Sequence, residues 1–264
     1  MDEIIKYPRT LHLRGSRLQA GDEGFGDVPF EALRGRHLVV EEKVDGANAG
    51  ISFSAAGELR VQSRGHFLRG GPRERQFDLL KTWTQSHRGW LRETLGTRYV
   101  LYGEWLFAKH TVFYDALPHL LLEFDVLDRE TGAFLSTELR RMLFDGCPLV
   151  AVPMLHAGPL DSLEQLTALI GPSAFRTARW RERLAAAAKE AGLDPARVAA
   201  ETDGSELMEG LYVKVEEGDR VLERYKYVRA DFLQAILASG SHWHDRPIVA
   251  NQLRPEADMF GQGG

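Results

Sequence analysis

The sequence predicts an α+β fold in which antiparallel strands carry the functional residues and helices flank them. Strand-like runs dominate residues 37–128, helical patterns dominate 136–201, and strand-like runs return over 207–229. This order lacks the regular alternation of strands and helices that predicts a doubly wound parallel sheet. We therefore expect the helical stretch to be an insertion within one domain.

The first strand-rich region contains five expected strands and one long expected helix. Turn signals near residues 57–58 and 64–65 predict that its first three strands form an antiparallel meander. The helix is expected over 74–95. The strands are expected at 37–42, 49–54, 59–63, 99–107 and 119–127.

Capping residues mark the helices expected in the insertion. Ser136 or Thr137 can cap a helix ending near 144, and residues 161–164 have capping-box spacing ahead of a helix to 171. Asp194 precedes a proline at the first helical position. Ser173 is expected to open a helix whose apolar face carries Trp180, Leu184, Ala187, Ala188 and Ala191. A last helix is expected over 231–238.

Composition limits the classes of partner and compartment. Net charge is −5 and the pI is about 6.0, which excludes nucleic-acid binding by overall charge and requires a local patch instead. The single cysteine, Cys147, fits a reducing compartment, and no apolar run approaches the roughly 18 residues of a membrane span. We expect a cytoplasmic protein without membrane contact. A basic run is either that patch or an ordinary solvated surface: Arg60, Arg64, Arg69, Arg73, Arg75 and Lys81.

Lys43 is the first candidate catalytic residue. It follows a β-branched run that predicts a buried strand, with Glu42 before it and Asp45 and Gly46 after it. A lysine at the end of a buried strand can act as a nucleophile when its surroundings favour the neutral amine. The same four residues also fit a surface lysine beside a turn.

Charged residues interrupt the other expected strands. Arg64 ends the third strand, Glu104 lies within an apolar strand, and acids flank Phe124. A late hairpin has charged residues at alternate positions, which include Glu209, Lys214, Arg224 and Lys226. Each could be an ion-paired strand face. Together, a nucleophile, cations, acids and an aromatic surface suit transfer of a nucleotide by attack on its α-phosphate.

The ordered motifs KxDG, SRG, YGE, FDV and EGxYVK, with a final lysine-bearing strand, resemble the covalent nucleotidyltransferase superfamily of ATP-dependent ligases and mRNA capping enzymes. Within it, the chain looks most like RNA ligases of the second phage type, a group that includes the kinetoplastid editing ligases. They share the start at Glu42 and Lys43, with a glycine and an asparagine at the positions of Gly46 and Asn48. The resemblance covers about 37–230.

The resemblance implies an ATP-grasp-like adenylyltransferase domain of antiparallel sheets over residues 1–238, with a helical insertion at about 136–201 and a polar tail at 239–264. The stretch after residue 229 is too short for an OB-fold domain. Lys43 would form a lysyl-AMP intermediate, and Phe124 would stack on adenine. The implied nucleotide-binding residues are Glu42, Asn48, Arg64, Glu104, Phe124, Lys214 and Lys226, and the implied metal ligands are Glu104 and Glu209.

The implied reaction joins nucleic-acid ends. Lys43 would take AMP from ATP, AMP would pass to a 5′-phosphate, and a 3′-hydroxyl would displace it. Mg²⁺, or Mn²⁺, would be the metal; RNA is the favoured substrate, and a protein partner could supply further substrate binding. The alternatives are a minimal DNA ligase, a capping-type guanylyltransferase that uses GTP, and a non-catalytic domain that binds nucleotides or nucleic-acid ends.

Arg224 departs from the family pattern, which often has a lysine there.

Overall fold

The computed structural model describes residues 3–18, 26–232 and 247–261. Most strands pair antiparallel, and helices pack around them, so the predicted α+β class is confirmed. The strands are Leu11–Leu13 (β1), Asp27–Val28 (β2), Leu38–Lys43 (β3), Ala47–Phe53 (β4), Leu59–Ser63 (β5), Tyr99–Trp105 (β6), Leu121–Asp128 (β7), Phe134–Leu135 (β8), Val150–Ala151 (β9), Met154–Gly158 (β10), Gly210–Glu217 (β11) and Arg220–Val228 (β12).

Short helices accompany this sheet, and none that the structure describes is long and apolar enough to cross a membrane. Two 3₁₀ helices lie at Phe30–Ala32 and Pro72–Phe77. The α-helices are Asp78–Ser86 (α1), Arg88–Leu95 (α2), Thr137–Leu143 (α3), Leu163–Thr167 (α4), Trp180–Glu190 (α5) and Pro195–Ala200 (α6).

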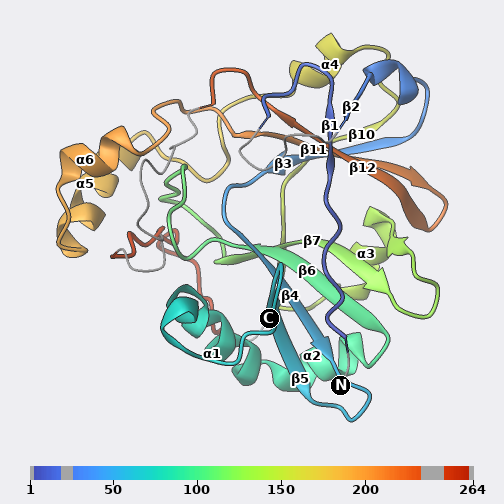
Figure 1. The fold of residues 1–264 in the computed structure, drawn as a ribbon, viewed down its shortest axis with the longest axis horizontal. Coiled ribbons are helices and arrows are strands. Elements are labelled where there is room, and N and C mark those ends of the chain that lie inside the picture. The colour runs from blue at the N-terminus through green and yellow to red at the C-terminus, as the bar shows by residue number, and fades with distance from the viewer. Residues whose placement is uncertain (1–2, 19–25, 233–246, 262–264) are drawn as a thin grey trace.

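The sheet consists of two halves, whose longer strands are labelled in Figure 1, and the short strand β8 joins them. One half has the order β10-β3-β11-β12, with β1 added beside β12, and the other has the order β7-β6-β4-β5. Helices α1 and α2 pack beside β4, β5 and β6, while α3 packs beside β7 and β8. Apolar side chains of β3 and β11, such as Val40 and Val213, pack with residues around α4 in a separate core.

The predicted three-stranded meander is wrong for its first strand. β4 and β5 pair antiparallel as expected, but β3 lies between β10 and β11 in the other half of the sheet. The segment after β3 is therefore a crossing between the two halves and not a hairpin turn. The remaining expected strands of this region agree with β5, β6 and β7 to within a residue or two.

The helix predictions are confirmed where a side chain caps the first turn. Ser136 and Asp194 each accept a hydrogen bond from a backbone N–H in the first turn of α3 and α6, as expected. The helix expected from 161–164 to 171 is shorter, because Ser162 is its cap and α4 ends at Thr167. Ser173 opens no helix, because its hydroxyl donates to Glu42, and α5 begins only at Trp180. The helix expected over 74–95 is two α-helices separated at His87. The short strands β1, β2, β8, β9 and β10 were not predicted, and most of the helix expected over 231–238 lies outside the described residues.

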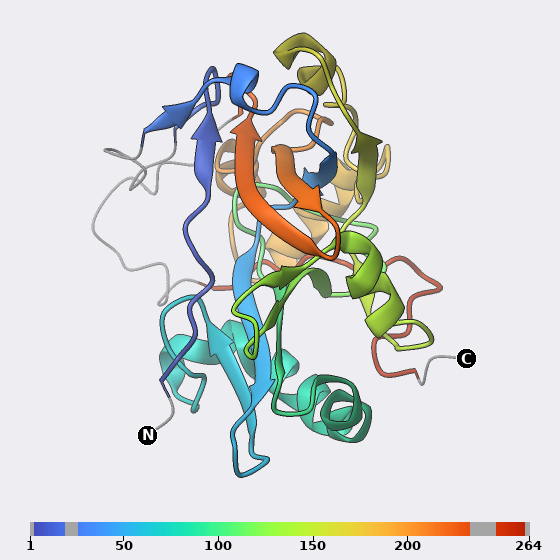
Figure 2. The same cartoon turned by 90° about the vertical axis from the view of Figure 1, so that its right-hand side faces the viewer.

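The N-terminal segment connects the two halves of the sheet. The carbonyl of Ile5 accepts hydrogen bonds from Tyr102 and Gln62 in one half, and β1 pairs with β12 in the other. Figures 1 and 2 both show this dark blue segment running along the molecule from one half to the other. At the opposite end of the chain, the described residues 247–261 pack against the same body, with Met259 in its main core.

A buried network of charges lies between β3, β7, β11 and α3. Arg140 is 1% exposed and contacts Glu41 at 2.6 Å and Glu123 at 3.0 Å. Lys214 is fully buried and contacts Glu41 at 2.9 Å and Asp125 at 3.1 Å. Buried charges are tolerated only when they are paired, so each member depends on the others.

Replacing Arg140 with methionine should therefore lower the free energy of unfolding by about 3–5 kcal/mol, since it leaves Glu123 buried and unpaired and weakens the pairing of Glu41. Urea unfolding measures the change. Arg141→Met is the matched control, because Arg141 is the exposed neighbour on the same helix and should change stability by no more than about 0.5 kcal/mol. Equal stability of the two variants would contradict the network's role.

Candidate active site

Lys43 and Glu209 form an ion pair at the edge of β3 and β11. The register of these strands places Lys43 opposite Gly210, and the Lys43 Nζ lies 2.6 Å from Glu209 Oε2. The lysine side chain is 19% exposed and the glutamate side chain is fully buried. Burial alone would lower the pKa of Lys43, but attraction to Glu209, with further attraction to Asp45 and Glu104, raises it above its ordinary value. Lys43 is thus an ammonium ion in the resting protein.

Gly46 makes the crossing after Lys43 possible. A Cβ at this position would lie 2.6 Å from Leu106 Cδ2 and 2.7 Å from the carbonyl oxygen of Trp105, so a larger residue would clash. Asp45 fixes the other side of the crossing, because its carboxylate accepts from the backbone N–H of Thr111 at 2.6 Å and of Val112 at 2.8 Å. The Asp-Gly pair therefore holds the backbone that follows the lysine.

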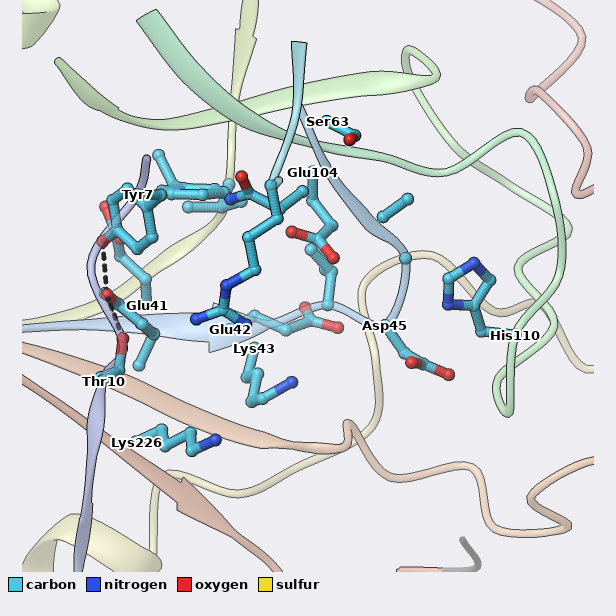
Figure 3. A pocket seen from close by; sticks show the side chains of 18 of the residues that line it. Tyr7, Thr10, Glu41, Glu42, Lys43, Asp45, Ser63, Glu104, His110 and Lys226 are labelled. Carbon is cyan, nitrogen blue, oxygen red and sulfur yellow. Dashed lines mark hydrogen bonds between the residues drawn. The ribbon is translucent and has the colours of Figure 1, made fainter. Parts of the chain in front are cut away.

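Glu104 lies on β6 and faces the same space as Lys43 (Figure 3). Burial raises its pKa to about 8; Lys43 lowers the pKa and the acids Asp45 and Glu209 raise it. Close to neutral pH this carboxyl group is largely protonated in the resting protein. A cation that bound beside it would favour its ionised form.

Asn48 lies directly opposite Glu104 on the neighbouring strand β4. Its Oδ1 is buried and has no hydrogen-bond partner among the described residues. Carboxylate and amide oxygens are ligands that Mg²⁺ accepts. Within the described ranges no group of three or more metal-ligating side chains is preassembled, so a metal here would take further ligands from phosphates and water.

A cavity of about 540 Å³ joins these residues to an aromatic wall. Phe124 packs edge-on against Tyr7 with ring centroids 5.1 Å apart, and Tyr212 lies 6.2 Å away. The hydroxyl of Tyr212 is 2.5 Å from that of Tyr7 and 3.1 Å from that of Thr10. The wall thus offers both ring faces and hydroxyl groups to a ligand.

Two predicted cations also line the cavity. Arg64 is exposed at the end of β5, and Lys226 projects from β12 on the side across from Glu104 (Figure 3). Arg224 does not line the cavity, and its guanidinium instead lies 3.8 Å over the ring of Phe134. Arg224, which stands where the family often has a lysine, is therefore not part of the cavity wall.

Two residues predicted to bind the nucleotide, Glu42 and Lys214, are held by contacts within the protein. The carboxylate of Glu42 borders the cavity but accepts hydrogen bonds from Ser173 at 2.6 Å and the backbone of Ala174 at 3.2 Å. Lys214 does not line the cavity; it is held in the buried network and also donates to the carbonyl of Phe124. The residues that the structure brings to the cavity are Lys43, Glu42, Asn48, Arg64, Glu104, Phe124 and Lys226.

Several residues of the cavity wall were not predicted from the sequence. Tyr7 and Thr10 come from the N-terminal segment, where no strand or helix periodicity marked them. His110 comes from the loop that anchors Asp45, and Glu41 from the buried network. Only Glu41 had a detectable signal, as an acid within an expected buried strand.

A sequence model of one protein family, the RNA ligases, matches residues 36–228, which contain the site from Lys43 to Lys226. The chain belongs to the RNA ligase family. Among curated proteins no match was found. Tyr7 and Thr10 lie before the matched segment, so this RNA ligase family member completes its cavity with residues outside it.

The solved structures that this RNA ligase family chain resembles include mutants of the Naegleria gruberi RNA ligase. One with ATP and Mn has 19% identity, a TM-score of 0.49, and coverage of 75% of this chain and 51% of that one. An apo mutant has 18% identity, a TM-score of 0.49, and coverage of 86% and 58%. The chain therefore spans little more than half the length of these proteins.

The pKa of Glu104 predicts how stability depends on pH. An unfolded glutamate ionises near pH 4.3, so between about pH 5 and pH 8 the folded protein holds a proton that the unfolded chain has lost. Stability should fall as the pH rises through this window. Glu104→Gln mimics the protonated group, so its Tm relative to wild type should increase from pH 5 to pH 8 in a metal-free buffer.

The exposed Glu93 provides the control for this titration. Glu93→Gln should show a constant Tm difference from wild type over the same range. If Glu104→Gln also gave a constant difference, the carboxyl group of Glu104 would be ionised throughout and the assigned pKa would be wrong.

Proposed function

We propose that this protein is an ATP-dependent RNA ligase that seals 5′-phosphate and 3′-hydroxyl ends through a lysyl-AMP intermediate. The observation that carries the proposal is the Lys43–Glu209 ion pair at a cavity that also holds Glu104, Asn48 and an aromatic wall, in a chain of the RNA ligase family. Family membership favours RNA over DNA and favours ATP over GTP as the nucleotide donor.

In the first step, the Lys43 amine attacks the α-phosphorus of ATP. A P–N bond forms, the bond to the bridging oxygen breaks, and pyrophosphate leaves. The lysine must lose a proton first, and Glu209 at 2.6 Å is placed to accept it. Glu209 and Asp45 keep Lys43 protonated at rest, so neutralising either of them lowers its pKa and favours the amine.

The other cavity residues would hold the nucleotide. Phe124, with Tyr7 and Tyr212, offers the surface on which adenine would stack. Arg64 and Lys226 would contact phosphate oxygens. Glu104 and Asn48 would contribute ligands to Mg²⁺ or Mn²⁺, which when bound neutralises phosphate charge.

In the two later steps, the 5′-phosphate of the nucleic acid displaces Lys43 from AMP, and the 3′-hydroxyl then displaces AMP to form the phosphodiester. Arg64 and Lys226 would neutralise these phosphates as well. A cytoplasmic location, in keeping with the single cysteine, is part of the proposal. So is a partner protein that adds substrate contacts.

The first step is tested by incubating the protein with α-labelled ATP and Mg²⁺ and measuring label on the denatured protein. Wild type should acquire label from ATP, and Lys43→Arg should acquire none, because arginine keeps a cation against Glu209 but supplies no neutral amine. Unchanged Tm would show that this variant is folded. Lys189→Ala, at an exposed lysine on α5, should label like wild type.

The donor and acceptor are tested in the same way. Label from GTP instead of ATP would indicate a capping-type guanylyltransferase, and absence of label from both would refute the ligase proposal. Transfer of the label to nicked RNA–RNA, RNA–DNA and DNA–DNA duplexes, or to single strands, identifies the acceptor. Sealing of DNA alone would exclude an RNA substrate.

A further inference from the structure

The loop that follows β5 brings basic side chains to the mouth of the cavity. Residues 64–77, here called the basic loop, contain no acid between Arg64 and Arg73, in a chain that has 38 acidic and 33 basic residues. Both ends of the loop border the cavity, through Arg64 and His66 at one end and Gln76 and Phe77 at the other. A ligand that enters the cavity from this side must pass beside the loop.

The basic loop is held in a defined conformation. Glu74 is 8% exposed, and its carboxylate accepts from the backbone N–H of Arg69 at 3.2 Å and of Gly70 at 2.7 Å. Gly70 and Gly71 have φ angles of 104° and 128°, which favour glycine, and these angles let the chain turn back toward Glu74. The Nε1 of Trp105 donates to the carbonyl of Gln76 at 2.6 Å. The arginines of the loop are therefore carried on a fixed backbone.

Three arginines of the loop have exposed side chains without an acidic partner among the described residues: Arg64, Arg69 and Arg75. Some exposed arginines elsewhere are paired, as Arg179 is with Glu182 and Arg197 is with Glu201, whereas others, such as Arg141, have no acidic partner in the described part of the chain. Lys81, from the same basic run, is also engaged, at 2.8 Å from Asp78. Three nearby cations in one loop, without acidic partners in the described ranges and with Arg64 at the cavity, form a local positive surface on an acidic protein.

We propose that the basic loop binds the phosphate backbone of the nucleic-acid strand whose 5′-phosphate enters the cavity. The inference rests on the proposed ligase function and adds to it the surface that holds the acceptor strand. Arg64 lies at the cavity itself, while Arg69 and Arg75 are exposed farther along the loop and do not line the cavity, so they would contact phosphates beyond the terminal one. Guanidinium groups suit phosphate oxygens because they donate two parallel hydrogen bonds.

The test compares two double variants. Arg69→Gln with Arg75→Gln removes two charges of the basic loop and leaves Arg64 in place. The matched control is Arg141→Gln with Arg220→Gln, two exposed arginines without acidic partners in the described part of the chain, which lie on α3 and β12 and do not line the cavity. Fluorescence anisotropy measures the Kd for a 5′-phosphorylated single-stranded RNA, without ATP, over a range of salt concentrations.

The loop variant should bind this RNA roughly tenfold more weakly at low salt, and the slope of log K against log salt should fall by about 1.4 for two lost phosphate contacts. The control should keep the wild-type affinity and slope. The loop variant should still form lysyl-AMP from ATP at the wild-type rate, since that step needs no nucleic acid. Wild-type RNA binding by the loop variant, or an equal loss in the control, would overturn the inference.

The two proposals fail separately in these assays. If wild type acquires no label from ATP, the ligase proposal fails, and the RNA affinities still show whether the loop binds phosphates. If wild type is labelled but the loop variant binds RNA normally, the ligase proposal stands and the strand is held elsewhere.

Discussion

The contact between the Lys43 Nζ and the Glu209 carboxylate is the constraint on which the geometry of the site depends. It exists because β3 and β11 pair in a register that sets Lys43 beside the residue after Glu209. Lys43 is the last residue of β3, and the chain then crosses at Gly46 into the other half of the sheet. The lysine therefore stands between the two halves, and residues from both, such as Glu104 on β6 and Lys226 on β12, reach the same cavity.

The charged groups around the cavity set the protonation states of Lys43 and Glu104 in the resting protein. Glu209 and Asp45 outweigh the burial of Lys43 and keep it protonated. Burial, with a smaller contribution from Asp45 and Glu209, raises the pKa of Glu104 to about 8 although Lys43 lowers it. A cation bound beside Glu104 would favour the ionised form of this carboxyl group.

The sequence predicted the strands of the site, and most of the expected site residues line its cavity, because strand ends and the residues beside them depend on local pattern. Strand ends near Lys43, Arg64 and Glu104 follow from apolar periodicity and turn residues within a short window. The pairing of β3 with β11 could not be predicted in this way, since β11 lies far along the chain and the pattern of one strand does not indicate which strand pairs with it. Tyr7 lines the cavity from a segment without periodicity. Arg140 on α3 is buried against Glu41 on β3 and Glu123 on β7, and no local pattern indicates these contacts.

The buried network gives the lysine strand and the aromatic wall a common support. Glu41 lies two residues before Lys43 and contacts both Arg140 and Lys214, and Lys214 contacts Asp125, which accepts a 2.5 Å hydrogen bond from Tyr7. An apolar core of equal volume would stabilise the fold as well or better, because burying charges costs hydration energy. The charged network also fixes the orientation of its side chains, since each contact holds two side chains in a defined position relative to each other. The contacts of this network with the lysine strand and with Tyr7 therefore fit a role in positioning Lys43 and the aromatic wall better than a gain in stability.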